Sequence, residues 1–159
     1  MRKRKIIGMT VLVFFCVVAT WFYLEFWLPH RTVYDEGLRY SAYQEDYRSC
    51  KKIRDASHKI LSHRIGNFYA AFIVIYDFGN KDSIPYLIHT LKRLNLQSQK
   101  PKATYPRFDI IHCANCLQKL TGMDFRGDYE AWENWWQQTG RHLPFDNEKG
   151  TLVHQEKGE

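Results

Sequence analysis

The hydrophobic pattern begins with an uninterrupted apolar run near the N-terminus. Residues 6–24 include no charged side chain, and Glu25 is the first acidic residue of the chain. A helix needs about 20 apolar residues to cross the hydrocarbon core of a bilayer. Trp21 and Trp27 lie where the aromatic belt of a membrane interface is expected. The pattern therefore predicts a transmembrane helix over residues 6–28.

The residues around this run predict how it lies in the membrane. Residues 1–5 form a basic segment, which the positive-inside rule keeps in the cytoplasm. A cleaved signal peptide is the alternative, but the small-residue site at residues 18–20 is followed by the bulky Trp21. We expect an uncleaved signal anchor, a connector over residues 29–33, and a C-terminal domain that is periplasmic or extracellular.

Beyond the connector, apolar residues recur at the three- and four-residue spacings typical of amphipathic helices. Residues 72–76 also have the β-branched and aromatic composition of a strand. A lone strand would leave its backbone groups without partners, so we interpret this segment as a buried helix. The pattern predicts helices over residues 34–61, 67–78, 84–94, 109–121 and 128–140.

Several residues mark the ends of these helices. Pro106 suits a first helical turn, where its missing N–H is no loss. Gly122 suits a C-terminus because glycine readily adopts the left-handed conformation. Asp128 and Ser83 are residue types that cap helix N-termini. Residues 95–105 are polar and aperiodic and are expected to form a loop.

Tryptophans dominate the last expected helix. Trp132, Trp135 and Trp136 follow one another at three- and four-residue spacing, and Gly140 ends the run. Each such aromatic can bury roughly 150–250 Å², so we interpret the cluster as a terminal core. Tryptophan also dominates binding hot spots, so Trp135 or Trp136, together with Tyr129, is a candidate contact with a partner protein.

The same region resembles a known family. Residues 117–125 read LQKLTGMDF, and a W-x-x-W-W pattern follows at residues 132–136. Both are similar to the closing segment of bacterial HEAT-like repeat proteins of the PBS-lyase type. Arg126 stands where that family often has glycine.

A second stretch supports the resemblance. Residues 82–91 read DSIPYLIHTL, which is similar to the first helix of a HEAT-like repeat. The resemblance covers residues 68–140 and implies a stack of helical hairpins that binds other proteins, with only some members tied to enzymes. Repeat units bury their apolar faces against neighbours and usually number three or more, so this short stack favours a protein partner.

The charge distribution changes little in this interpretation. The chain carries a formal charge of +6, and the basic segment at its start supplies four of the 23 Lys and Arg residues. The remaining basic excess is mild, so we expect no nucleic-acid partner.

Cysteines are the residues most suggestive of chemistry. Cys113 and Cys116 form a C-x-x-C motif, but it lies inside an expected helix, whereas redox enzymes place it at a helix N-terminus. The pair can serve as small buried core residues. One of them can instead form a disulfide with Cys50 in an oxidising compartment. His112 adds a third potential metal ligand, but it points about 100° away from Cys113 on a helix, so we expect no metal site.

No other catalytic or cofactor-binding motif is present, and His58 and His63 are expected at the surface. The sequence predicts an all-α, HEAT-like domain over residues 34–143 behind a transmembrane helix, with a flexible tail over residues 144–159. The expected function is non-catalytic protein binding, as an adaptor or assembly factor, without a cofactor. The alternatives are a thiol-dependent enzyme that uses Cys113 and Cys116, or a small-ligand or cell-wall-binding module.

Overall fold

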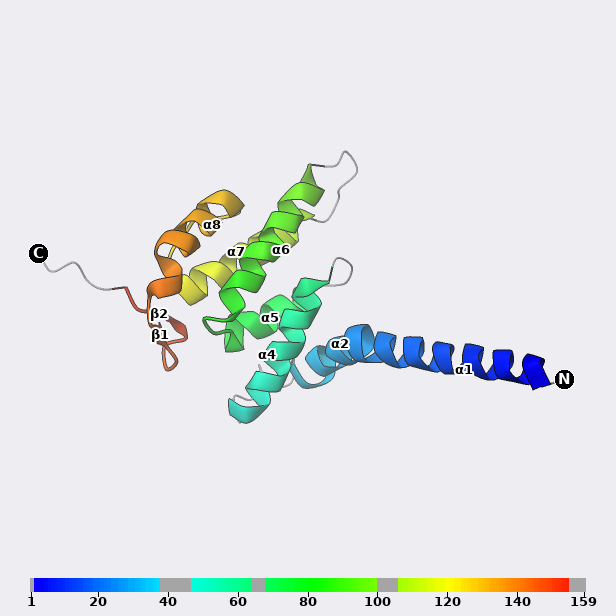
Figure 1. Ribbon diagram of the computed structural model, residues 1–159. Coiled ribbons are helices and arrows are strands. Elements are labelled where there is room, and N and C mark those ends of the chain that lie inside the picture. Colours follow the sequence, from blue (N-terminus) through cyan, green and yellow to red (C-terminus); the bar gives the residue numbers. More distant parts are fainter. Residues whose placement is uncertain (1, 38–46, 64–67, 100–105, 155–159) are drawn as a thin grey trace, which may run out of the picture.

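A computed structural model describes residues 2–37, 47–63, 68–99 and 106–154. In these parts the protein is all-α apart from one short β-hairpin, as the sequence predicts for its fold class (Figure 1). The N-terminal elements are α1 (Arg2–Phe22), η1 (Tyr23–Trp27), α2 (Leu28–Thr32) and η2 (Val33–Gly37). The domain comprises α4 (Tyr47–Ser62), α5 (Tyr69–Phe78), α6 (Ser83–Ser98), α7 (Pro106–Thr121), α8 (Tyr129–Gln138), η3 (Gly140–His142), β1 (Phe145–Asp146) and β2 (Thr151–Leu152).

The N-terminal elements follow one another as one long helix, of which Met9–Gly37 is long and apolar enough to cross a membrane. The expected connector at residues 29–33 is therefore helical. Pro29 lies in the first turn of α2, directly after the π-helical η1. A π-turn widens the helix, which accommodates a residue that lacks an N–H group.

The part of this helix from residue 25 to residue 37 packs against α4 and runs in the opposite sense along it. Glu25 pairs with Lys59 near the C-terminal end of α4, with a distance of 2.6 Å between carboxylate and ammonium. Further along, Glu36 pairs with Lys52 at 2.8 Å. The two helices therefore run in opposite directions, and α1 extends beyond the C-terminal end of α4.

The contact between this helix and the domain is close. Pro29, Thr32, Val33 and Gly37 are buried. A Cβ atom on Gly37 would lie 2.7 Å from a methyl group of Val74. The end of this N-terminal helix is therefore part of the domain core, and no free linker separates α1 from the domain.

The central part of the domain is two hairpins packed side by side, α4–α5 and α6–α7 (Figure 1). The second helices of the hairpins run in the same direction. The Tyr69 and His112 rings meet near their N-terminal ends, with centroids 5.1 Å apart. The Lys119 ammonium lies 4.1 Å from the centroid of the Tyr76 ring near their C-terminal ends. The first helices, α4 and α6, also pack together.

The segment at residues 67–78 is helical from Tyr69. This agrees with the argument that a lone strand would leave its backbone groups without hydrogen-bond partners. It is buried on several sides because α4, α7 and η2 all pack against it. The buried residues of α5 are Ala70, Ala71, Phe72, Val74 and Ile75.

Several of the expected helix ends are confirmed. The helix expected to begin at residue 34 does not begin there, because residues 33–37 form η2 and continue the N-terminal helix, and residues 38–46 lie outside the described residues. α7 begins at Pro106 and ends at Thr121, and Gly122 has a φ of +73°. The Asp128 carboxylate accepts a hydrogen bond from the Ala131 N–H at 3.0 Å.

Two expectations about α6 are wrong. The Ser83 hydroxyl makes no capping bond, because it accepts from the Asn80 N–H and bonds His58. The helix also continues to Ser98 rather than ending at Leu94. Ser98 closes the last turn by donating its hydroxyl to the Asn95 carbonyl at 2.8 Å.

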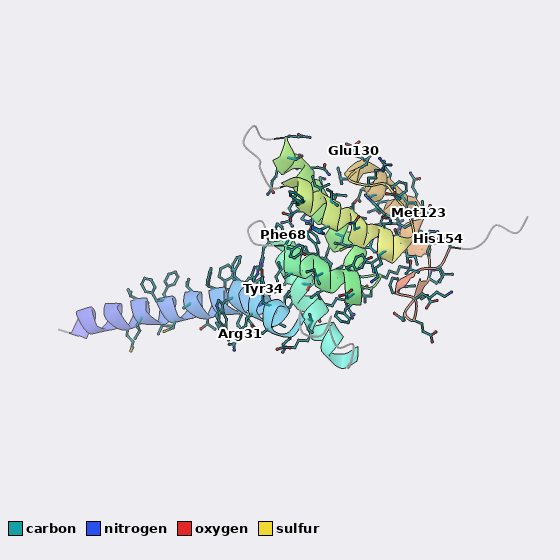
Figure 2. All side chains as sticks on the ribbon, turned by 180° about the vertical axis from the view of Figure 1, so that it is seen from behind. Arg31, Tyr34, Phe68, Met123, Glu130 and His154 are labelled. Atoms are coloured by element: carbon teal, nitrogen blue, oxygen red, sulfur yellow. The ribbon has the colours of Figure 1, made fainter. Side chains whose placement is uncertain are left out.

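The C-terminal segment differs from the expected loose tail up to residue 154. β1 and β2 pair antiparallel, and Leu152 is buried against the domain. The His154 ring bonds the Thr121 carbonyl at the end of α7. This hairpin covers the end of the stack opposite to α1, where Figure 2 labels Met123 and His154.

Candidate functional site

A hollow of about 420 Å³ opens along the groove between α5 and α7. It arises because these two helices lie parallel and each turns a polar and aromatic face outward. We call it the α5–α7 groove. Its main lining residues are Tyr69, Ile73 and Tyr76 on α5, and His112, Asn115 and Lys119 on α7.

The rim of the groove is aromatic and cationic. Tyr69 and Tyr76 are each about half exposed, and they lie two turns apart on the same face of α5. His112 contacts the edge of the Tyr69 ring, and the Lys119 ammonium lies over the face of the Tyr76 ring. Half-exposed tyrosines beside a cation offer apolar area, a hydroxyl and a positive charge to one ligand.

Asp77 lines the end of the groove that lies at the C-terminus of α5. Burial raises the pKa of the Asp77 carboxyl, and the nearby Lys119 charge opposes this rise. A second hollow, of about 450 Å³, continues from this point toward the β-hairpin. Tyr76, Asp77 and Lys119 line both hollows, so the groove extends past the end of α5.

The floor of the groove includes one of the cysteines singled out from the sequence. Cys116 is buried, and its thiol donates to the Phe72 carbonyl at 3.3 Å. Burial raises the pKa of the Cys116 thiol to about 12. The thiolate is the nucleophilic form of cysteine. The Cys116 thiol therefore stays protonated at neutral pH and is a poor nucleophile.

Cys113 lies deeper in the core than Cys116. Its thiol is fully buried and donates to the Leu87 carbonyl at 3.2 Å. Burial, and then the neighbouring Cys116 and Asp109 charges, raise its pKa well above the usual value. Both thiols are free in the structure. The side chain of Cys50, the third member of the suggested disulfide, lies outside the described residues.

The tryptophan cluster packs mainly inside the protein. Trp132 is fully buried, and its indole N–H donates to the Arg126 carbonyl at 2.9 Å. Trp136 is also buried, and Trp135 is partly buried between Phe125 and the other indoles. Of the suggested contact residues, Trp135 and Tyr129 therefore keep only part of their surface exposed. Tyr129 presents its ring to the Lys92 ammonium at 5.1 Å.

His58 was expected at the surface, and this expectation is wrong. Its ring is buried, bonds the Ser83 hydroxyl at 2.8 Å and stacks on Tyr86 with centroids 4.4 Å apart. Burial, reinforced by the Arg54 charge, lowers the pKa of His58 to about 4. His58 is therefore a neutral hydrogen-bonding residue that joins α4 to α6.

His63 is also largely covered. Its ring stacks on Phe26 of η1 with centroids 4.4 Å apart. Within the described residues, no group of three or more His, Cys, Asp and Glu side chains is placed to hold a metal ion.

Sequence reasoning missed the α5–α7 groove. The helical signal was present, since Tyr69, Ile73 and Tyr76 share one face of α5. Identifying the groove also requires knowing that α7 lies parallel to α5, and this follows from the packing of the two hairpins. Comparison with family models, curated proteins and solved structures found no match to this chain.

Proposed function

We propose that this protein is a membrane-anchored adaptor or assembly factor that binds a partner protein through its HEAT-like helical domain, outside the cytoplasm. The α5–α7 groove is the observation that carries this proposal. It offers two half-exposed tyrosines, a cation and an acid along one open channel. Interfaces favour such tyrosines because one ring supplies apolar area together with a polar tip.

The arrangement of the hairpins adds support. Equivalent helices of neighbouring hairpins lie side by side, α4 with α6 and α5 with α7. This is the arrangement that the HEAT-like resemblance leads us to expect, and stacked hairpins commonly use the surface formed by one helix layer to bind partners. The basic segment at residues 1–5 supports an orientation with the domain on the other side of the membrane.

A small-ligand or cell-wall-binding module is the second candidate. A hollow of about 420 Å³ falls within the usual range of ligand pockets, roughly 300–1,000 Å³. The thiol-dependent enzyme has less support, because burial keeps both Cys113 and Cys116 protonated at neutral pH.

Site-specific photocrosslinking in intact membranes tests the proposal. A photoreactive amino acid replaces Tyr76 in the groove, and Tyr86 is the matched control because it is a similarly exposed tyrosine on α6. We expect one protein adduct from position 76 and none from position 86. Adducts of low mass from position 76 would favour the ligand-binding alternative. Identical adducts from both positions would contradict a groove-specific partner.

A further inference from the structure

The end of the domain that faces the anchor carries an unusual concentration of exposed apolar side chains. Beyond residue 37, the four most exposed large hydrophobic residues among those described are Phe108, Leu96, Ile111 and Tyr69, at 69%, 58%, 53% and 50% exposure. Phe108 and Ile111 lie in the first two turns of α7, Leu96 in the last turn of α6, and Tyr69 at the start of α5.

These positions share one end of the stack. α4 and α6 finish at this end, and α5 and α7 begin there, because successive helices alternate in direction. The Arg93 guanidinium on α6 donates to the Leu61 and Ser62 carbonyls at the end of α4. The Tyr69 ring contacts His112, which neighbours Ile111 on α7. Residues far apart in sequence are thereby gathered on one surface.

The anchor leaves the domain from this same end. Glu25 pairs with Lys59 at 2.6 Å, and Phe26 stacks on His63, both at the C-terminal end of α4. Figure 1 shows α1 extending away from the domain on the side where α4 and α6 end. Figure 2 places Phe68 on the anchor side, and Met123 and His154 on the opposite side.

The close packing of the anchor helix fixes this geometry. Since Pro29, Thr32, Val33 and Gly37 are buried in the domain, the domain cannot swing freely about a linker. A bilayer around α1 would face the end that carries Leu96, Phe108 and Ile111. Aromatic and aliphatic side chains exposed at that level gain by entering the interfacial layer of the membrane.

We propose that Leu96, Phe108 and Ile111 form a second membrane contact, which inserts into the outer surface of the bilayer that α1 crosses. This inference rests on the proposed anchoring by α1. The contact holds the hairpin ends against the membrane, so that the α5–α7 groove opens sideways, close to the membrane surface. The groove would therefore select the membrane-proximal part of a partner.

Spin-label accessibility in lipid nanodiscs tests this contact on the full-length protein. Single cysteines are introduced as Leu96→Cys and Phe108→Cys, in a background with Cys16→Ser and Cys50→Ser. Cys113 and Cys116 stay, because both are buried, and the background protein without an added cysteine measures their labelling. Each nitroxide is then probed with oxygen, which concentrates in the bilayer, and with a water-soluble nickel chelate.

Two reference sites make the result decisive. Val153→Cys is the matched aqueous control, because Val153 is an exposed apolar residue at the opposite end of the domain. Val13→Cys in α1 reports the membrane interior. We expect the oxygen-to-nickel accessibility ratio at positions 96 and 108 to lie between the ratios at positions 13 and 153, and severalfold above that at position 153.

Three results would overturn the proposal in distinguishable ways. Ratios at positions 96 and 108 equal to that at position 153, with a lipid-like ratio at position 13, would reject the second contact and leave the anchor intact. A water-like ratio at position 13 would reject the anchoring and the contact together. Low accessibility to both reagents at positions 96 and 108 would indicate coverage by protein rather than by lipid.

Discussion

At the scale of single residues, Arg126 occupies a conformation that suits glycine. Its φ is +50°, in the left-handed region. A side chain there costs roughly 1–2 kcal/mol because Cβ approaches the backbone. Its carbonyl nonetheless accepts the Trp132 indole N–H, so the turn positions the largest buried side chain of the domain.

Replacing Arg126 tests whether this strain is real. Arg126→Gly is expected to raise the free energy of unfolding by about 1 kcal/mol relative to Arg126→Ala, because only glycine relieves the Cβ contact. Urea unfolding of the two variants, followed by tryptophan fluorescence, measures the difference. Equal stability of the glycine and alanine variants would show that the turn is unstrained.

His58 makes the stability of the domain dependent on pH. Its pKa falls from the usual 6.5 to about 4 on folding. The unfolded chain therefore binds a proton before the folded protein does, and stability decreases as the pH drops from about 6.5 to about 4. Below this range His58 causes no further loss. Arg54 and Lys51 oppose protonation in the folded state, whereas Asp55 and Asp82 favour it.

The variant His58→Gln should show a weaker pH dependence. Glutamine can still bond the Ser83 hydroxyl but does not titrate in this range. Between pH 6.5 and 4 the wild type should lose on the order of 2 kcal/mol more stability than the variant. Urea unfolding at several pH values checks this. Asp77 and Asp109, whose pKa values burial raises, titrate in both proteins and cancel in the comparison, so parallel profiles would exclude a role for His58.

At the scale of elements, local signals predicted the helices well where the signal lies in a few adjacent residues. Gly122 and Asp128 mark their helix ends because the conformation and the capping bond are local. The helical interpretation of α5 depended on a packing argument instead. The hairpin of β1 and β2 was missed because two-residue strands have no periodicity, and its burial depends on Leu152 reaching α7.

Gly37 lies at the end of η2, where the N-terminal helix packs against α4 and α5. The sequence did not predict this contact. A Cβ atom there would lie 2.7 Å from Val74 and 2.9 Å from Ile53. Gly37→Ala is therefore expected to destabilise the protein by about 1–2 kcal/mol through overpacking, even though alanine favours a helix. Thermal unfolding of the full-length protein in detergent measures this cost.

A double variant separates close packing from a general effect of the substitution. In Gly37→Ala with Val74→Ala, the smaller side chain at position 74 makes room for the new methyl group. The double variant should lose less stability than the two single losses combined. Strict additivity would show that η2 does not contact α5 as closely as described.

At the scale of the whole molecule, an apolar helix and a helical domain share one core. The sequence predicted both parts, since the apolar run and the helical periods are local patterns. From the sequence we expected a connector between them, whereas the structure buries Pro29, Thr32, Val33 and Gly37 in the domain. The α5–α7 groove is likewise a property of the assembled stack, because Tyr76 and Lys119 are 43 positions apart in the sequence.

The most direct test of the proposed function is the recovery of a partner from membranes. Full-length protein is purified after crosslinking as wild type, as Tyr69→Ala with Tyr76→Ala, and as the matched control Tyr86→Ala, and stoichiometric partners are identified by mass spectrometry. The account predicts one dominant partner with wild type and control. Under this account, removing the two groove tyrosines should lower its recovery at least about tenfold in the groove variant. Equal recovery of the same proteins by all three, or no stoichiometric partner with the wild type, would contradict the account.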